Sequence, residues 1–258
     1  MNVAIITGAS SGMGKEFALQ MDCHFKKIEE FWLVARREEE LNELAACLQH
    51  KCRIFAMDVT MSGQLQRLEY TARLENARIC MLVQCAGYGV MGPFETVPLK
   101  DCVGMIRLNC EALTELTSRM LPYLRENARI IMLASVAAFL PQQDFAVYAA
   151  SKSYVLSFSR ALARELKKKK VYVTAVCPGP VDTPFFDVAE KNGSTLAIKK
   201  YFMARPEAVV AKALRDSYHK KELSVYGISM NALLLGTKLL PHGVFLSVAG
   251  SMKKAGEE

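Results

Sequence analysis

The stretch VAIITGASSGMGKEFALQM, residues 3–21, decides the fold class of this chain. Its first residues are apolar and β-branched, which is typical of a buried strand, and residues 15–21 favour a helix. Between them, Gly8 permits a sharp turn, Gly12 lets the backbone approach a ligand closely, and Gly14 lets the helix pack against the strand. A helix that begins directly after such a turn presents oriented N–H groups. The stretch therefore predicts a binding site for the diphosphate of a dinucleotide.

The same alternation of apolar runs and helical segments continues along the chain. Expected helices include Glu38–His50, Gln64–Asn76 and Ser151–Lys169. Strands that alternate with helices indicate a parallel sheet covered on both faces. We therefore predict an α/β fold, a Rossmann-type doubly wound sandwich with a central, mostly parallel seven-stranded sheet, as a single domain over residues 1–258. The expected strands are Val3–Thr7, Phe31–Ala35, Arg53–Asp58, Ile79–Cys85, Arg129–Ala134, Val171–Cys177 and Leu223–Ser229.

The composition is that of a globular protein. The chain is 51% hydrophobic and 23% charged, too apolar for a disordered protein and too interrupted by charge for a membrane bundle. The net charge of +7 is uneven, since residues 1–150 hold 15 basic and 17 acidic side chains and residues 151–258 hold 18 and 9. This excess fits an anionic cofactor, substrate or membrane surface at least as well as nucleic acid, and we expect no nucleic-acid partner.

The eight cysteines predict neither disulfides nor a metal site. They form no C-x-x-C pair and show no zinc-like spacing with the four histidines. Cys80 and Cys177 lie inside apolar runs, where a free thiol behaves as a small hydrophobic group, so we expect a reducing compartment. The N-terminus shows no signal-peptide pattern, and a cytoplasmic location is expected.

Two further strand ends carry residues suited to a nucleotide. Where many NAD-binding folds place an acid on the adenosine ribose, the second strand ends at Ala35 and is followed by Arg36 and Arg37. A guanidinium can bind a 2′-phosphate in bidentate fashion, so these residues predict NADP(H), with Arg36 the first contact and Arg37 the second. Asp58, at the end of the third strand, faces the ligand crevice and can accept a hydrogen bond from the adenine amino group.

A set of motifs resembles, in order and spacing, the short-chain dehydrogenase/reductase family over residues 1 to about 215. The motifs are TGASSGMG at the first turn, Ala86-Gly87, Asn109, Ser135, YAASK at 148–152 and PGPVDT at 178–183. The resemblance implies a nicotinamide-dependent oxidoreductase with the catalytic residues Asn109, Ser135, Tyr148 and Lys152. One departure is Gln84-Cys85, where the family usually has Asn-Asn. Whether Gln84 replaces the sheet-binding role of the first Asn is left open.

The catalytic chemistry also follows from the residues. Tyr148 and Lys152 are four residues apart and share one face of a helix. A tyrosine hydroxyl, with a pKa of about 10, is a poor base unless a cation stabilises its phenolate, so we expect Lys152 to lower the pKa of Tyr148. Ser135 is expected to bind the carbonyl oxygen. The resemblance implies that Lys152 also holds the nicotinamide ribose and that Asn109 positions a water for proton relay.

The expected ligand contacts fall into two sets. Large apolar residues gather in the loops after the fourth, fifth and sixth strands, with a lid at about 184–205. These residues favour a hydrophobic carbonyl or alcohol substrate, such as a steroid, a long acyl chain or an aromatic ketone. The expected substrate contacts are Val90, Met91, Phe94, Val136, Phe145, Phe185 and Phe186. The expected cofactor contacts are Gly8, Ser10, Ser11, Gly12, Met13, Gly14, Arg36, Arg37, Asp58, Val59, Tyr148 and Lys152. The resemblance to the family adds Cys85, Ala86, Gly87, Pro178, Gly179, Val181 and Thr183.

Three functions remain open at this point. The first is an NADP(H)-dependent carbonyl reductase, the second a 3-oxoacyl thioester reductase of lipid metabolism, and the third a non-catalytic NADPH-binding sensor or scaffold. Lys191, Lys199 and Lys200 belong either to a solvated face or to a site for an acidic substrate tail. The apolar and basic tail, about 230–258, fits packing in a homodimer or homotetramer, a cover over the pocket, or peripheral contact with a membrane, and subunit packing is favoured over membrane contact.

Overall fold

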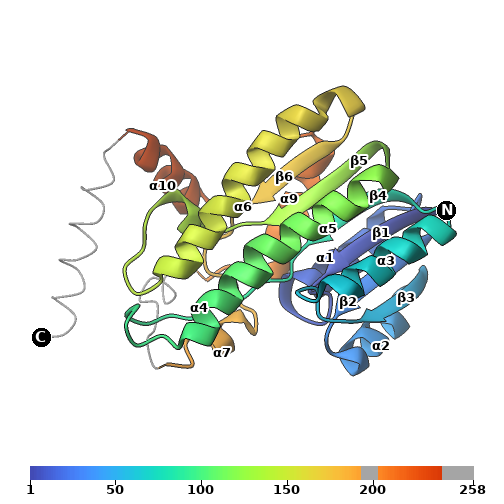
Figure 1. The fold of residues 1–258 in the computed structure, drawn as a ribbon. Helices are drawn as coiled ribbons and strands as arrows, with labels where there is room; N and C mark the ends of the chain where they lie inside the picture. Colours follow the sequence, from blue (N-terminus) through green and yellow to red (C-terminus); the bar gives the residue numbers. More distant parts are fainter. Residues whose placement is uncertain (193–202, 240–258) are drawn as a thin grey trace, which may run out of the picture.

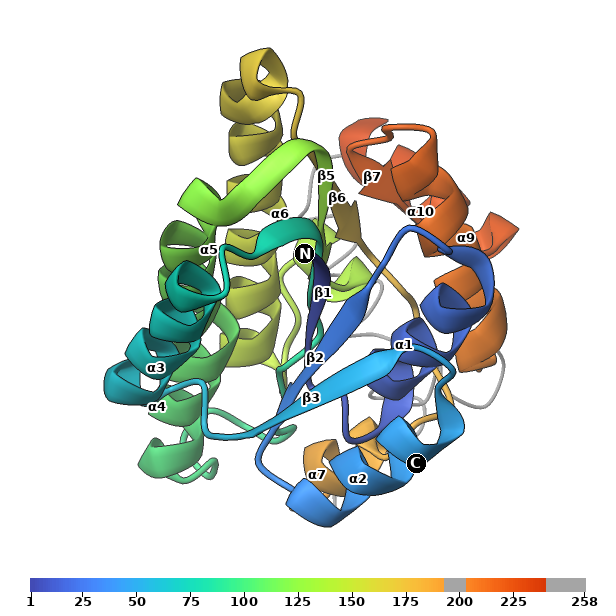
Figure 2. The same ribbon diagram turned by 90° about the vertical axis from the view of Figure 1, so that its right-hand side faces the viewer.

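The computed structural model describes residues 1–192 and 203–239, and these form three layers, a sheet between two layers of helices (Figures 1 and 2). The sheet has seven strands in the order β3-β2-β1-β4-β5-β6-β7, and every neighbouring pair is parallel. This confirms the predicted fold class, with a sheet that is all parallel rather than mostly so. The strands are β1 (Asn2–Thr7), β2 (Glu30–Ala35), β3 (Lys51–Ala56), β4 (Arg78–Gln84), β5 (Leu124–Leu133), β6 (Tyr172–Val176) and β7 (Leu223–Ser224).

Both faces of the sheet are buried because alternate strand residues enter two separate apolar cores. In β1, Val3 and Ile5 pack into one core, whereas Ala4 and Ile6 pack into the other. Figure 2 shows the two helical layers on either side. One layer holds α3 (Ser62–Leu74), α4 (Leu99–Ile106), α5 (Leu113–Met120) and α6 (Ala146–Glu165), and the other holds α1 (Gly12–His24), α2 (Glu38–Cys47) and α9 (Pro206–Tyr218). Two further helices are α7 (Phe185–Ala189) and α10 (Ile228–Leu239).

Some element boundaries differ from the prediction. The last strand was expected over Leu223–Ser229, but β7 pairs only as far as Ser224. Gly227 then adopts a φ of +88°, which turns the chain into α10. In the other direction, α6 begins at Ala146 rather than Ser151, so Tyr148 lies inside the helix, one turn before Lys152.

Gln84 ties the end of β4 to the helical layer. Its amide Nε2 donates to the Thr117 hydroxyl on α5 at 2.7 Å, and that hydroxyl donates to the Leu113 carbonyl at 2.7 Å. All three groups are buried, so each polar atom in the chain of bonds is satisfied without water. Gln84 thus links strand and helix from the position where the family usually has Asn.

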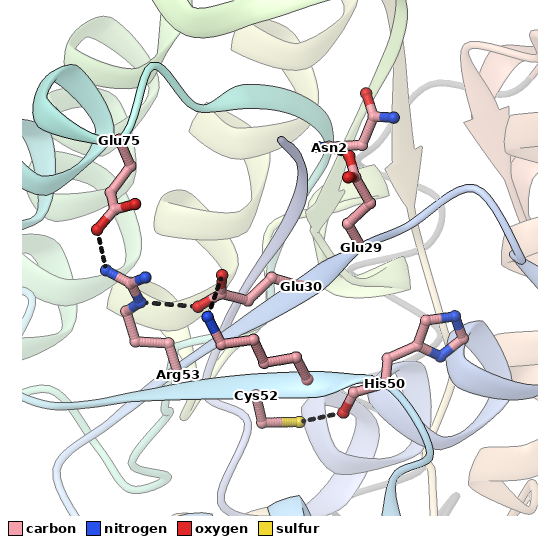
Figure 3. A network of polar contacts seen from close by, with 8 residues as sticks. Asn2, Glu29, Glu30, His50, Cys52, Arg53 and Glu75 are labelled. Atoms are coloured by element: carbon pink, nitrogen blue, oxygen red, sulfur yellow. Dashed lines mark hydrogen bonds and ion pairs between the residues drawn. The ribbon is translucent and has the colours of Figure 1, made fainter.

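A charged network holds together the end of the sheet at which β2 and β3 begin, opposite the glycine turn (Figure 3). Glu30, at the start of β2, is 0% exposed and accepts from Arg53 Nε of β3 at 2.7 Å. Arg53 also binds Glu75, just after α3, at 3.0 Å, and the Lys51 ammonium lies 3.4 Å from Glu30. A buried carboxylate without partners would be costly, so this network specifies how β2, β3 and α3 meet.

Candidate functional site

A cavity of about 890 Å³ lies at the carboxyl ends of the parallel strands. It stands where the chain order reverses between β1 and β4, the position at which open α/β sheets bind ligands. The turns after β1, β2, β4, β5 and β6 all contribute to its wall. A shallower hollow of about 400 Å³, near the starts of β4 and β5, contains none of the predicted site residues.

The glycine turn after β1 has the geometry of a diphosphate cradle. Gly8 and Gly12 adopt φ values of +67° and +52°, and a Cβ at Gly14 would lie 2.2 Å from the Gly8 carbonyl oxygen. Only glycine therefore fits these positions. The N-cap of α1, Ser11, makes no side-chain capping bond, so its side chain does not occupy the first N–H groups of the helix. This backbone fits a dinucleotide diphosphate.

The two arginines after β2 both line the cavity, but only Arg37 has a direct contact with the glycine turn. Its guanidinium donates to the Ser10 hydroxyl at 3.0 Å and pairs with Glu40 at 3.2 Å. Arg36, which the sequence placed first, lies exposed at the same edge of the cavity. Asp58 also lines this end, and one carboxylate oxygen accepts from the Thr60 N–H at 2.9 Å and from the Thr60 hydroxyl at 2.7 Å.

Ser135, Tyr148 and Lys152 meet at the middle of the cavity. Ser135 begins a short 3-10 helix, Val136–Phe139, and its hydroxyl accepts from the Ala137 N–H at 3.1 Å. The side chains of Ser135 and Tyr148 are hydrogen-bonded to each other. Lys152 Nζ donates to the Leu133 carbonyl at 2.7 Å, which anchors the ammonium at the end of β5. The structure thus brings three of the four expected catalytic side chains to one point.

Burial decides the acidity of these groups. It raises the pKa of the Tyr148 hydroxyl well above its usual value, against the opposing effect of the hydrogen bond from Ser135. Burial also lowers the pKa of Lys152 to about 8. Lys152 was expected to lower the pKa of Tyr148, but in this structure burial outweighs the lowering effects and the pKa of the phenol is raised. Tyr148 is therefore protonated at neutral pH and can donate its proton as an acid.

Asn109 lies in a π-helical segment, Arg107–Ala112, between α4 and α5. Its amide Nδ2 donates to the Tyr88 carbonyl and to the Ser151 hydroxyl, both at 2.9 Å, and its Oδ1 accepts from the Tyr88 N–H at 3.1 Å. A Cβ at Gly87 would lie 2.9 Å from Asn109 Oδ1 and 3.3 Å from Lys152 Nζ. Gly87 thus leaves room for Asn109 and Lys152 to approach each other. Such π-helical turns are frequent at functional sites.

The segment after β6 passes over the glycine turn. Pro178 accepts from the Val136 N–H at 3.0 Å, and Val181 forms a β-bridge with Ala204. A Cβ at Gly12 would lie 3.3 Å from the Thr183 Cβ, so Thr183 stands directly over the turn. The expected cofactor contacts from both segments therefore face one space, together with Met13, Val59, Cys85, Ala86, Gly87 and Gly179.

The expected substrate residues separate into two groups. Val136, Phe145, Phe185 and Phe186 line the cavity. Val90 and Met91 are buried in an apolar cluster that also includes Phe145, and Phe94 is 69% exposed; none of these three lines the cavity. Lys191 lines the cavity and pairs with Asp101 of α4 at 2.8 Å. Lys199, Lys200 and part of the expected lid, residues 193–202, lie outside the described residues, as do residues 240–258 of the tail.

Several cavity residues were not singled out from the sequence. Met230 and Leu233 bring α10 into the wall, and a Cβ at Gly179 would lie 2.8 Å from the Met230 sulfur. This contact supports a pocket-covering role for the inner face of α10, one of the three roles left open for the tail. The apolar character of the tail was visible in the sequence. Which part of the fold it packs against depends on tertiary contacts, which a local sequence pattern does not predict. Further examples are Arg107, Leu108 and Gln142.

Within residues 1–192 and 203–239, no helix has the length and apolar character needed to span a membrane. No group of three or more histidine, cysteine, aspartate or glutamate side chains there is arranged to hold a metal ion.

Comparisons with known proteins agree with this geometry. The chain is 32% identical over 184 residues to an uncharacterized oxidoreductase of Staphylococcus epidermidis, covering 70% of this chain and 79% of that one. It is 30% identical over 183 residues to a very-long-chain 3-oxoacyl-CoA reductase of Pyrenophora tritici-repentis, covering 67% of this chain and 53% of that one. The fold is similar to a Sphingobium yanoikuyae short-chain dehydrogenase in complex with NADPH (TM-score 0.78, 24% identity, 100% and 96% coverage). It is equally similar to a Burkholderia phymatum short-chain dehydrogenase/reductase in complex with NAD (TM-score 0.78, 22% identity, 95% and 95% coverage).

A family model described as short chain dehydrogenase matches residues 2–193. The match spans the glycine turn, the catalytic residues and the turn after β6. It ends before α9 and α10, which complete the second helical layer and the cavity wall. The chain therefore belongs to the short-chain dehydrogenase family and is an oxidoreductase.

Proposed function

We propose that this protein is an NADP(H)-dependent oxidoreductase that interconverts a ketone and a secondary alcohol on a hydrophobic substrate. The observation that carries the proposal is that Ser135, Tyr148 and Lys152 line the same cavity as the glycine turn. The cofactor supplies the hydride when bound. The chain's own residues must orient the carbonyl, deliver a proton to its oxygen and exclude water.

The protonated phenol of Tyr148 suits the reductive direction. An oxygen that gains negative charge during hydride transfer needs a proton, and the raised pKa of Tyr148 keeps that proton on the phenol at neutral pH. Ser135, hydrogen-bonded to Tyr148, can share the same substrate oxygen and stabilise its developing charge. Lys152, with a pKa near 8, is charged at neutral pH and adds positive potential beside this point.

The preference for NADP(H) rests on the charge around the adenosine end of the cavity. Arg36 and Arg37 stand there, with Arg37 held against Ser10 of the glycine turn at 3.0 Å. Guanidinium groups bind phosphates in bidentate fashion, and no acidic residue follows directly after β2 to repel a 2′-phosphate.

A hydrophobic substrate is supported by the aromatic wall beside the catalytic residues. Phe185 contacts both Tyr148 and Phe186, with ring centroids 5.5 Å apart in each pair, and Val136 and Phe145 extend this surface. A 3-oxoacyl thioester is the second candidate substrate class. It is favoured by the similarity to a protein named very-long-chain 3-oxoacyl-CoA reductase.

The test is NADPH oxidation, followed by absorbance, on steroid ketones, 3-oxoacyl thioesters, aromatic ketones and small diketones, with NADH in parallel. We expect turnover with NADPH on one apolar class, and the class that reacts decides between the two candidates. Arg37→Asp should raise the KM for NADPH at least tenfold, about the 1.4 kcal/mol of one lost charged contact, and leave the KM for NADH within about twofold. Equal weakening of both cofactors contradicts the 2′-phosphate role, and tight NADPH binding without turnover favours a sensor.

A further inference from the structure

We infer that Phe145 and Gly89 are positioning residues for the acid Tyr148, holding its phenol in place and shielding it from water. The inference rests on the proposed function for its kinetic consequence, but the contacts that carry it are independent of substrate. The rings of Phe145 and Tyr148 are stacked, with centroids 4.2 Å apart and planes 18° from parallel. The two residues are only 6% and 7% exposed.

The stack forms at the beginning of α6. Phe145 is the N-cap residue of this helix, with φ −147° and ψ 27°, and lies three positions before Tyr148. Side chains three residues apart meet across the first turn, so the cap places the Phe145 ring against the phenol. Phe185 of α7 adds a tilted contact to Tyr148, with centroids 5.5 Å apart. Aromatic rings from two elements therefore restrict the rotation and tilt of the phenol.

Gly89 lies so close to both rings that no side chain fits between them and its backbone. A Cβ at this residue would lie 2.7 Å from Tyr148 Cδ2 and 2.8 Å from Phe145 Cζ. Gly89 does not adopt the left-handed backbone conformation that favours glycine, so space alone requires the missing side chain. Any larger residue would displace the rings, and the Tyr148 hydroxyl would move relative to Ser135. An error of about 1 Å in such a geometry can cost on the order of 100-fold in rate.

Shielding has a second consequence, for the titration of the phenol. Burial raises the pKa of Tyr148, and the stacked ring supplies part of that burial. The other groups that face the phenol are Ser135, whose hydrogen bond lowers this pKa, Cys177 after β6, which raises it, and Lys152 on the same helix, whose Nζ is 5.6 Å from the ring centroid. Loss of the Phe145 ring admits water and shifts the Tyr148 titration to lower pH, while these neighbours stay in place.

The experiment compares Phe145→Leu, Phe145→Tyr and Gly89→Ala with two controls. Phe139→Leu removes an equally buried ring from the main core, and Gly63→Ala adds a Cβ that meets nothing within 4 Å. We expect Phe145→Leu and Gly89→Ala to lower kcat by about 10- to 100-fold with the NADPH Kd within about twofold. Phe145→Tyr keeps a stacking ring and should restore kcat to within about threefold, and both controls should stay near the wild-type rate.

A readout without substrate separates this inference from the proposed function. The difference in alkaline tyrosinate absorbance between each protein and its Tyr148→Phe derivative reports the titration of Tyr148 alone. We expect this titration at lower pH in Phe145→Leu than in wild type or Phe139→Leu. An unchanged titration, or a kcat loss that Phe145→Tyr does not rescue, overturns the positioning role. A wild-type protein that turns over no carbonyl overturns the proposed function, while the absorbance comparison still decides the role of Phe145.

Discussion

The acidity of two side chains sets what the site can do at the scale of single residues. Tyr148 keeps its proton because it is buried, and Lys152 gives up its proton more readily than an exposed lysine for the same reason. Their titrations are thus moved in opposite directions, the phenol to higher pH and the ammonium to a pKa of about 8. A neutral Tyr148 acid and a charged Lys152 therefore coexist below about pH 8.

The pH dependence of reduction should report Lys152. Because its folded pKa is lowered to about 8, the charged form predominates below that pH and is lost above it. We expect kcat/KM for carbonyl reduction to fall as the pH rises through about 8, while Tyr148 stays protonated. The measurement is the initial rate of NADPH oxidation from pH 6 to about 10. Lys152→Arg, which stays charged throughout, should lack this limb, and a flat wild-type profile would count against the assignment.

At the scale of elements, the catalytic pair was predictable and its surroundings were not. Tyr148 and Lys152 share a helix face because their spacing is a local property, and the structure places both on α6. Phe94 was predicted to contact the substrate, but the path of its loop leaves its side chain exposed. The contact of Arg37 with Ser10 depends on how the chain turns after β2, and a residue type cannot specify that turn.

The bond between Gln84 and Thr117 should matter for stability because it joins two elements in the core. Thr117→Val removes the acceptor and leaves the buried Gln84 amide without its partner. We expect the free energy of unfolding to fall by about 1–3 kcal/mol, measured by urea denaturation. Thr117→Ser retains the hydroxyl and should lose clearly less. No loss in Thr117→Val, which keeps the packing of the side chain but not the hydroxyl, would contradict the role of the hydrogen bond.

At the scale of the whole molecule, a seven-stranded sheet buried on both faces places the strand ends, and so the site, at one edge. Sequence motifs predicted this edge because they follow strands in order. They did not predict Met230, which reaches Gly179 from α10 across about fifty residues of chain. Such a contact depends on tertiary packing. Self-association, location in the cell and contact of the tail with a membrane stay predictions.

The buried carboxylate of Asp216 should contribute to the stability of the whole fold against acid. Burial alone would raise the pKa of Asp216, but bonds from Lys212, Lys221 and Ser224, at 2.6, 2.9 and 2.8 Å, outweigh it and hold the pKa below its usual value. A carboxyl whose folded pKa is lowered stabilises the fold above its unfolded value, about 3.9, and this contribution is lost as the pH falls below it.

The corresponding test is Asp216→Asn, with the exposed Asp187→Asn as its control. We expect Asp216→Asn to lower the free energy of unfolding at pH 7 by about 1.5–3 kcal/mol, and the gap to wild type to narrow below about pH 4. Urea denaturation of each variant and of wild type, at pH 7 and again below pH 4, measures these free energies of unfolding. A gap that does not change with pH would mean that the carboxylate charge is not the cause.

The central claim is that Tyr148 delivers the proton in an NADPH-dependent reduction. Its most direct test is the turnover of Tyr148→Phe on the carbonyl compound that wild type reduces fastest, with NADPH binding measured in parallel. We predict a kcat lower by about 10²- to 10⁴-fold and an NADPH Kd within about twofold of wild type, because the ring remains and only the acid is lost. Turnover at the wild-type rate in Tyr148→Phe would contradict the account.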